Sequence, residues 1–516
     1  MSKLSRKLRS SSLFISDRRV FNLILVVLTL FLSIAPWFFI IKLENWDKAV
    51  FILIIIAIIG IRWGLFGYVF LLVSISPFAW IIFNIDRIPV YGWVLTNIPR
   101  EEKLIILLGG GYLLLLFFTR MRYINRTHII PFLLLSGILV FGLLVALVFA
   151  WFPGPDSVAM QWYLDTIIVG IVVYYLISSF VNDVKRFHAI IYAVIISAIL
   201  IALVTVIFPK VLIVNYIADT DPGRLGGFFT LPFGVTIWAN PVYISSYMAL
   251  AIVFIWGHLI TENLIIWKRI FWLVNFGLLT RVLVLTNSRT GIYGAFLGII
   301  LLSGLVILRR RILPGQPVRS NHLIQWLGIG LLIVVGGAIA FWQFNDYFNN
   351  INNASFYIDR ILRPLEDPNT IGRVYLFLAS LKANLAYPWG IGAQAIYTIT
   401  GHNEHNLYTI MLSGLGWGGF GLFICFVGWC VLKCISGIRS IEKERSFLAT
   451  LVLSGITTVI FMGWGHPFVG TLWGVTLLWS LFALAASLPK LGRHSDFRTL
   501  KEPSDEFTCL SSHSHL

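Results

Sequence analysis

Residues 407–432 read LYTIMLSGLGWGGFGLFICFVGWCVL and contain no charged side chain. About 20 such residues cross the hydrocarbon core of a bilayer as a helix, so this run predicts a membrane span. Comparable apolar runs occur at about 20–41, 49–61, 65–84, 104–119, 129–151, 164–181, 189–208, 244–261, 270–286, 291–308, 323–342, 447–463 and 470–488. The sequence therefore predicts an all-α, polytopic transmembrane bundle of about 12–14 spans.

The composition excludes a soluble protein. Of the 516 residues, 58% are hydrophobic and only 12% are charged, and the mean hydropathy is +0.86. A membrane-spanning β-barrel is also excluded, because its strands alternate in polarity, whereas these runs are continuously apolar.

Basic residues indicate the orientation of the chain. The net charge is +16, but Lys and Arg lie mostly in short loops between spans, which is a topology signal and argues against nucleic-acid binding. The opposite loops 152–163 and 464–469 contain no Lys or Arg. Positive residues favour the cytoplasm, so both termini are predicted to be cytoplasmic.

The chain is predicted to have one large domain with short ends. Residues 1–19 form a basic cytoplasmic N-terminus, 20–488 the transmembrane domain, and 489–516 a cytoplasmic tail. Two long loops, 209–243 and 343–405, are predicted on the outer side, where long loops often carry function. Short amphipathic helices are expected in the second loop at 359–363 and 372–377, and a turn at 388–392.

Histidine and arginine side chains gather at the predicted outer boundary. His402, Glu404 and His405 immediately precede the 407–432 run, and Arg224 and Arg373 lie in the long loops. Arg289 occupies a tight turn, 287–291, between two spans. Ionisable groups at such positions are candidates for function.

This set of side chains suits a lipid diphosphate. The arginine fork matches phosphate oxygens, and an imidazole can accept a proton from an attacking hydroxyl. The arginines, together with the positive end of a helix beginning near Asn403, favour a neutral, base-competent His405. With arginine neutralising the leaving diphosphate, no metal ion and no cofactor are expected.

Four motifs resemble the O-antigen ligase/polymerase superfamily of membrane glycosyltransferases. They are Gly223-Arg224-Leu225-Gly226-Gly227 with Asn240-Pro241; Ser288-Arg289-Thr290-Gly291; Gly372-Arg373 with Pro388-Trp389-Gly390-Ile391-Gly392; and His405-Asn406 with Gly416, Gly419 and Phe420. Phe420 stands where the family pattern has an aliphatic residue. The resemblance covers roughly 200–430 of this sequence.

The resemblance implies an activity and residue roles. It implies transfer of an undecaprenyl-diphosphate-linked glycan to a hydroxyl acceptor, either a lipid core glycan or another repeat unit, at the periplasmic face of the bacterial inner membrane. His405 would activate the acceptor, and Arg224, Arg289 and Arg373 would hold the diphosphate. Membrane lipids are the other expected partners.

Several alternatives stay open. His402, Glu404 and His405 with His466 suggest a weak metal site, and the arginines can act as interfacial anchors. Arg281, inside an apolar run, is a secondary candidate expected to face the bundle interior or a water-filled cavity. The glycines at 414–419 are most simply close-packing positions.

A transporter of small anions such as bicarbonate, or of lipid-linked glycans, is the alternative function, with charges and broken helices expected at the bilayer midplane. A scaffold for polysaccharide assembly leaves the histidine and arginines unexplained.

Overall fold

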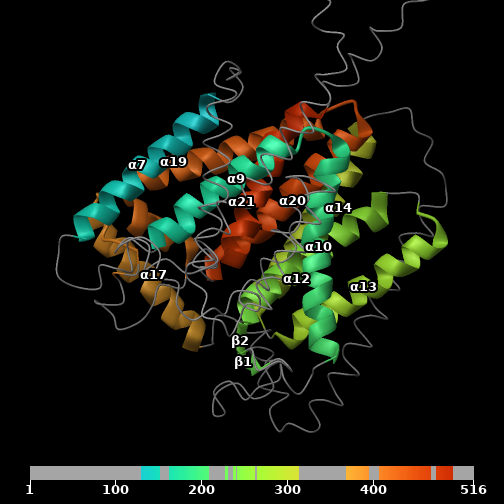
Figure 1. Cartoon of the computed structure of the whole chain (residues 1–516), viewed down its shortest axis with the longest axis horizontal. Coiled ribbons are helices and arrows are strands. Elements are labelled where there is room, and N and C mark those ends of the chain that lie inside the picture. Colours follow the sequence, from blue (N-terminus) through green and yellow to red (C-terminus); the bar gives the residue numbers. More distant parts are fainter. Residues whose placement is uncertain are drawn as a thin grey trace, which may run out of the picture.

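A computed structural model describes residues 129–150, 162–207, 227–230, 236–239, 241–261, 264–286, 288–312, 368–393, 395, 406–465 and 472–491 (Figure 1). The predicted spans at about 20–41, 49–61, 65–84, 104–119 and 323–342 lie outside these residues. So do the predicted terminal segments 1–19 and 492–516 and the expected helix at 359–363.

The described chain is helical, which confirms the predicted fold class. The α-helices are α7 (Ile129–Ala150), α9 (Val169–Phe180), α10 (Val184–Ile207), α12 (Pro241–Thr261), α13 (Ile266–Leu285), α14 (Arg289–Ile312), α17 (Pro368–Ala386), α19 (Leu407–Ile438), α20 (Lys443–Gly465) and α21 (Leu472–Ser487). A π-helical turn, Tyr163–Ile168, leads into α9, and a 3-10 turn, Leu488–Lys490, follows α21.

Six of these helices are long and apolar enough to cross a membrane, as judged for the described residues alone. They are α7, α10, α12, α14, α19 and α20. The apolar stretches Thr166–Phe180 and Gly474–Lys490 are shorter. These helices are compatible with a membrane-embedded protein, in agreement with the composition.

Helix α12 forms the centre of the bundle. Its side chains from Met248 to Phe254 are almost wholly buried, and the helix packs against α10, α13, α14 and α20. A helix that is apolar on every face is suited to a buried position, which α12 occupies here. Small residues bring the neighbours close: a Cβ at Gly298 of α14 would overlap Thr458 of α20 and lie 2.7 Å from Val253.

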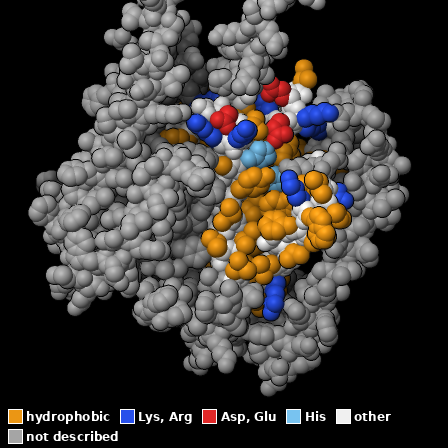
Figure 2. Space-filling view, turned by 45° about the vertical axis from the view of Figure 1, so that its right-hand side comes forward, with side chains coloured by type: hydrophobic (Ala, Val, Ile, Leu, Met, Phe, Trp, Pro, Cys, Tyr) orange, Lys and Arg blue, Asp and Glu red, His pale blue; other side chains and the backbone are white. Residues whose placement is uncertain are grey.

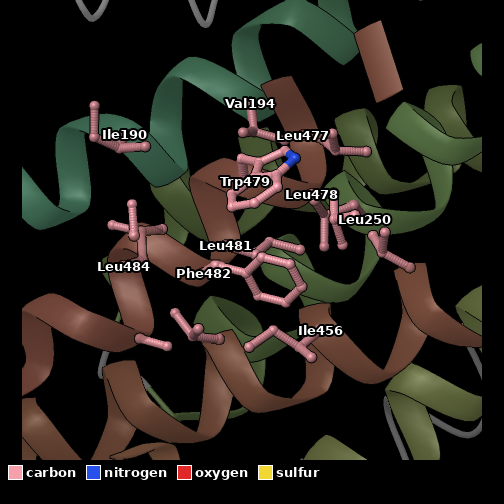
Figure 3. Packing of buried hydrophobic residues seen from close by; sticks show 14 of the residues in the cluster. Ile190, Val194, Leu250, Ile456, Leu477, Leu478, Trp479, Leu481, Phe482 and Leu484 are labelled. Carbon is pink, nitrogen blue, oxygen red and sulfur yellow. The ribbon is translucent and has the colours of Figure 1, made fainter. Parts of the chain in front are cut away.

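Aromatic side chains fill the space between α21 and its neighbours. Figure 3 shows side chains of α10, α12, α20 and α21 gathered around Trp479 and Phe482. Trp479 is fully buried, and Gly170 of α9 makes room for its indole ring, because a Cβ there would overlap it. Close glycine contacts of this kind let helices associate where the surrounding lipid gives no hydrophobic driving force.

Charged side chains gather at one edge of the described bundle, bordering an apolar surface (Figure 2). His188 of α10 contacts Glu444 of α20, with 2.6 Å between Nε2 and Oε1. Arg309 at the end of α14 donates to the Lys443 carbonyl over 3.3 Å. These contacts bring loops predicted to be cytoplasmic to a common end of the bundle. That this end faces the cytoplasm stays a prediction.

The two long loops differ from their predicted structure. The first loop contains an antiparallel hairpin, β1 (Gly227–Thr230) paired with β2 (Thr236–Ala239), which the sequence analysis did not predict. The signal was present in the sequence: aromatic and β-branched residues flank a segment with Pro232 and Gly234. In the second loop, the short helix predicted at 372–377 is part of the 19-residue helix α17.

Candidate functional site

The predicted site residues are described only in part. Arg224, His402, Glu404 and His405 lie outside the described residues, as does His466 of the metal alternative. Arg281, Arg289 and Arg373 are described. Helices α19 and α20, which adjoin residues 402–405 and 466 in the sequence, are described.

Arg289 is the first residue of α14, at the tight turn that the sequence predicts. Helix α13 ends at Leu285, and Ser288 lies just before α14. The Ser245 hydroxyl of α12 donates to Ser288 Oγ over 2.9 Å, and Ser288 lies 3.3 Å from the Thr290 hydroxyl. These buried hydroxyls fix the start of α14 to the start of α12, and so hold half-buried Arg289 in place.

Arg373 of α17 approaches the start of α14 through Gly465, the last residue of α20. A Cβ at Gly465 would lie 3.6 Å from Arg373 Nη1 and would overlap the Thr290 methyl group. The residue next to Arg289 and the guanidinium of Arg373 thus flank the same glycine. The structure therefore places Arg373 near Thr290, the residue that follows Arg289 in the sequence.

The start of α19 is fixed to the same end of α20. Asn406 caps α19, since its side-chain oxygen accepts from the backbone N–H groups of Tyr408, over 2.8 Å, and Thr409, over 3.3 Å. Its side-chain nitrogen donates to the Trp464 carbonyl over 2.9 Å. Helix α19 begins at Leu407, so the prediction of a helix start near Asn403 was wrong. Asn406, the residue after His405, therefore stands beside Trp464, the residue before Gly465.

Aromatic side chains line this junction, and sequence reasoning missed them. The Trp464 ring lies 5.3 Å from the Phe377 ring of α17 and 5.7 Å from the Tyr408 ring of α19, measured between centroids. The Tyr408 hydroxyl donates to the Ile460 carbonyl over 2.8 Å. No spacing in the sequence links these residues, because they come from three different helices.

Helix α19 is broken at Gly416, where the sequence predicted a continuous span. Gly416 has φ 65° and ψ 177°, a backbone conformation that is essentially restricted to glycine. A Cβ there would lie 2.5 Å from the Trp389 carbonyl oxygen. Gly414, Gly418 and Gly419 are close-packing positions as predicted, against Trp162 for Gly414 and Phe141 for the other two.

The turn after α17 completes the backbone hydrogen bonds at this break. In a regular helix the N–H of residue 417 would donate to the carbonyl of residue 413. Here the Trp417 N–H donates to the Pro388 carbonyl over 3.0 Å. The Ser413 carbonyl accepts from Ile391 and Gly392, over 3.1 and 3.0 Å. The predicted turn at 388–392 thus replaces the lost helical partners, as an apolar medium requires.

A buried polar group joins α17 to the break. Asn384 donates to Ser413 Oγ over 3.0 Å and to the Ser380 carbonyl over 2.9 Å. The Trp417 indole N–H donates to the Asn384 carbonyl over 2.9 Å. Sequence reasoning did not identify these residues. Helix α17, which carries Arg373, is therefore held to α19 by hydrogen bonds at its C-terminal half.

Arg281 does not face the bundle interior as expected. Its side chain is exposed on α13, and it lies about one turn before the end of this helix at Leu285. A long side chain near a helix end can extend to the membrane boundary. The expectation of the bundle interior was therefore wrong, whereas a water-filled cavity and the candidate role of Arg281 stay predictions.

The junction has the chemistry of an anion site. Arg289 and Arg373 supply positive charge, and the starts of α14 and α19, the positive ends of their helix dipoles, both lie beside the end of α20. Among the described residues, no group of His, Cys, Asp and Glu could hold a metal ion.

Comparison with known proteins adds no assignment: no family model matches the chain, and no curated protein matches it.

Proposed function

We propose that this chain is a membrane glycosyltransferase that moves an undecaprenyl-diphosphate-linked glycan to a hydroxyl acceptor. The reaction takes place at the periplasmic face of the bacterial inner membrane, and the acceptor is a lipid core glycan or a second repeat unit. The observation that carries the proposal is the meeting of Arg373, Thr290 beside Arg289, and the start of α19 around Gly465.

The roles follow from the chemistry of the side chains. Arg289 and Arg373 bind the diphosphate with paired hydrogen bonds, and Arg224 assists them. His405, which precedes the cap residue of α19, takes the proton from the acceptor hydroxyl as the oxygen attacks the anomeric carbon. The bond between the anomeric carbon and the diphosphate oxygen breaks, and the diphosphate leaves on its lipid with its charge neutralised by arginine. Neither a metal ion nor a cofactor takes part.

The second candidate is a transporter, and the break in α19 is the observation that favours it, because transporters use broken helices at their binding sites. Residues 417–438 continue as helix after the break for about 33 Å, at 1.5 Å per residue. That length matches the whole hydrocarbon core of about 30 Å. The break therefore fits the membrane boundary better than the midplane, which favours the transferase.

The test uses purified protein in liposomes with a lipid-diphosphate-linked oligosaccharide as the sole substrate. Products with additional repeats identify a polymerase, and transfer only after a candidate acceptor glycolipid is added identifies a ligase. His405→Ala is expected to lower the rate at least about 100-fold, the usual contribution of a positioned base, while donor binding is retained. Loss of donor binding in this variant with unchanged residual chemistry would contradict the assigned role.

Matched variants on α17 test the arginine. Arg373→Ala is expected to weaken donor binding about 10-fold or more, because a charge-assisted hydrogen bond contributes about 1.5–3 kcal/mol. Lys382→Ala removes a positive charge from the same helix at an exposed position and is expected to bind donor normally. If both variants bound the donor equally weakly, Arg373 would contribute only its positive charge and would not contact the diphosphate specifically. Uptake of the lipid-linked glycan or of an anion without any new glycosidic bond would establish the transporter instead.

A further inference from the structure

Helix α17 presents its polar side to the protein and its apolar side outward. Ser380 and Asn384 are fully buried and face α19, where they form hydrogen bonds at Ser413. The large side chains on the outer side are exposed. We call them the α17 stripe, which consists of Ile371, Val374, Tyr375, Leu378 and Leu385.

The α17 stripe is a continuous face and not a set of scattered residues. Each member lies three, four or seven positions from at least one other member, which places them on one side of a helix. Lys382 is the only charged residue on that side, as judged from the same helical spacing. An amphipathic helix on a water-soluble surface has the opposite arrangement, with its apolar side facing inward.

The end of α17 carries exposed aromatic side chains. Tyr387 and Trp389 follow the helix directly, and Trp389 is 81% exposed. Tyr and Trp concentrate where a bilayer meets water, because their rings are apolar and their N–H or O–H groups are polar. The aliphatic stem of Lys382 can lie along the apolar stripe while its ammonium group reaches the headgroups. Both features point to lipid, and not protein, as the partner of this face.

The direction of α17 differs from that of the spans. It is not among the helices judged able to cross a membrane. In Figure 1 it runs across the line of α7 and α19 at one end of the bundle. The turn at 388–392, which follows α17, meets α19 at Gly416. The length of the helix from 417 to 438 places Gly416 near the membrane boundary.

We propose that α17 is an interfacial helix that lies in the plane of the membrane, with the α17 stripe inserted among the acyl chains of one leaflet. Insertion of such helices reaches about 5–10 Å below the headgroups. Arg373 lies on the side of α17 that faces Gly465, and this arrangement keeps it at the depth of lipid phosphates. The proposal rests on the polarity of α17 and does not depend on the proposed enzymatic activity.

Spin labels at three positions of the full chain in liposomes test this directly. Ile371→Cys, Leu378→Cys and Leu385→Cys lie seven residues apart on the stripe, in a background with Cys425→Ser and Cys509→Ser. Cys430 and Cys434 are fully buried and do not label. Collision with oxygen and with a water-soluble nickel complex reports the depth of each label. All three labels are expected to favour oxygen and to lie at equal depth within a few ångströms.

Helix α7 offers a matched control with the same spacing. Leu133, Val140 and Leu147 are exposed on this candidate span, and a label at Val140 is expected to lie up to about 10 Å deeper than its neighbours, from seven residues of helical rise. Ile441, exposed between α19 and α20, gives the aqueous reference.

Three results would overturn the proposal. If the label at position 378 lay deeper than those at 371 and 385, as expected for the central label of α7, α17 would be a membrane span. Ready collision with the nickel complex, as at Ile441, would place the stripe in water. Weak collision with both reagents would mean that a protein surface covers it.

Discussion

Asn406 donates a hydrogen bond from its side-chain nitrogen to the Trp464 carbonyl, over 2.9 Å and across 58 positions of sequence. The same side chain caps α19 through its oxygen. One residue therefore fixes both where α19 begins and which helix end lies beside that beginning. The residue that precedes Asn406 in the sequence is His405, the proposed base.

Replacing Asn406 separates its two contributions. Asn406→Ala removes the cap and the bond to Trp464, and the loss of a cap alone lowers the free energy of unfolding by about 1 kcal/mol. Asn406→Ser keeps a capping oxygen but cannot reach the Trp464 carbonyl in the same way. We expect Ala to lower the melting temperature more than Ser, and both to reduce transfer. The melting temperature is measured by tryptophan fluorescence. Normal transfer by the Ser variant would show that the cap alone matters.

Gly416→Ala tests the break in α19. The change places a Cβ against the Trp389 carbonyl and imposes a backbone strain of about 1–3 kcal/mol. We expect a lower melting temperature and weaker attachment of the 388–392 turn, visible as faster proteolysis there. Gly421→Ala is the control, because it lies on the same helix with nothing within 4 Å of the added Cβ. Alanine there is expected to be neutral or stabilising by up to about 1 kcal/mol. Equal stability of the two variants would argue against the break.

Gly465→Ala tests the junction of α14, α17 and α20. The added methyl group would overlap the Thr290 methyl and push apart the elements that hold Arg289 and Arg373. Thr290→Ser removes that methyl and keeps the hydroxyl that lies near Ser288. We expect the single change to reduce donor binding and the double variant to recover much of it. The coupling between the two positions, about 0.5–3 kcal/mol for contacting residues, is obtained from a double-mutant cycle. Strictly additive effects would contradict the contact.

At the opposite end of the bundle, His258 should matter more for stability than Glu444. His258 is fully buried, and its ring packs at centroid distances of 5.5–5.6 Å from the rings of Tyr192, Trp272 and Phe447. Such ring pairs contribute about 0.5–1.5 kcal/mol each. Glu444 is half exposed, and its contact with His188 is worth no more than about 1 kcal/mol. Thermal unfolding of His258→Ala and Glu444→Gln should show the larger loss in the former. The reverse order would mean that the ion pair dominates this end.

Much of the helical fold could be predicted because apolar length is a local property. The run at 407–432 and the turn at 287–291 appear in the structure as a long helix and as the junction before Arg289. The break at Gly416 could not be predicted, since four nearby glycines look alike in sequence and only one meets the turn at 388–392. The hairpin formed by β1 and β2 was missed, although aromatic and β-branched residues on both sides of Pro232 and Gly234 were visible in the sequence.

The sequence by itself determined the class of protein and the composition of the candidate site. Hydropathy sets which segments are helical, and the residue types supply arginine and histidine chemistry. Only the tertiary structure decided which of these groups meet. Thr290 and Arg373 flank Gly465 because small residues let α14, α17 and α20 approach closely, whereas packing leaves Arg281 exposed on α13. Packing depends on contacts between residues far apart in the chain, which no local pattern encodes.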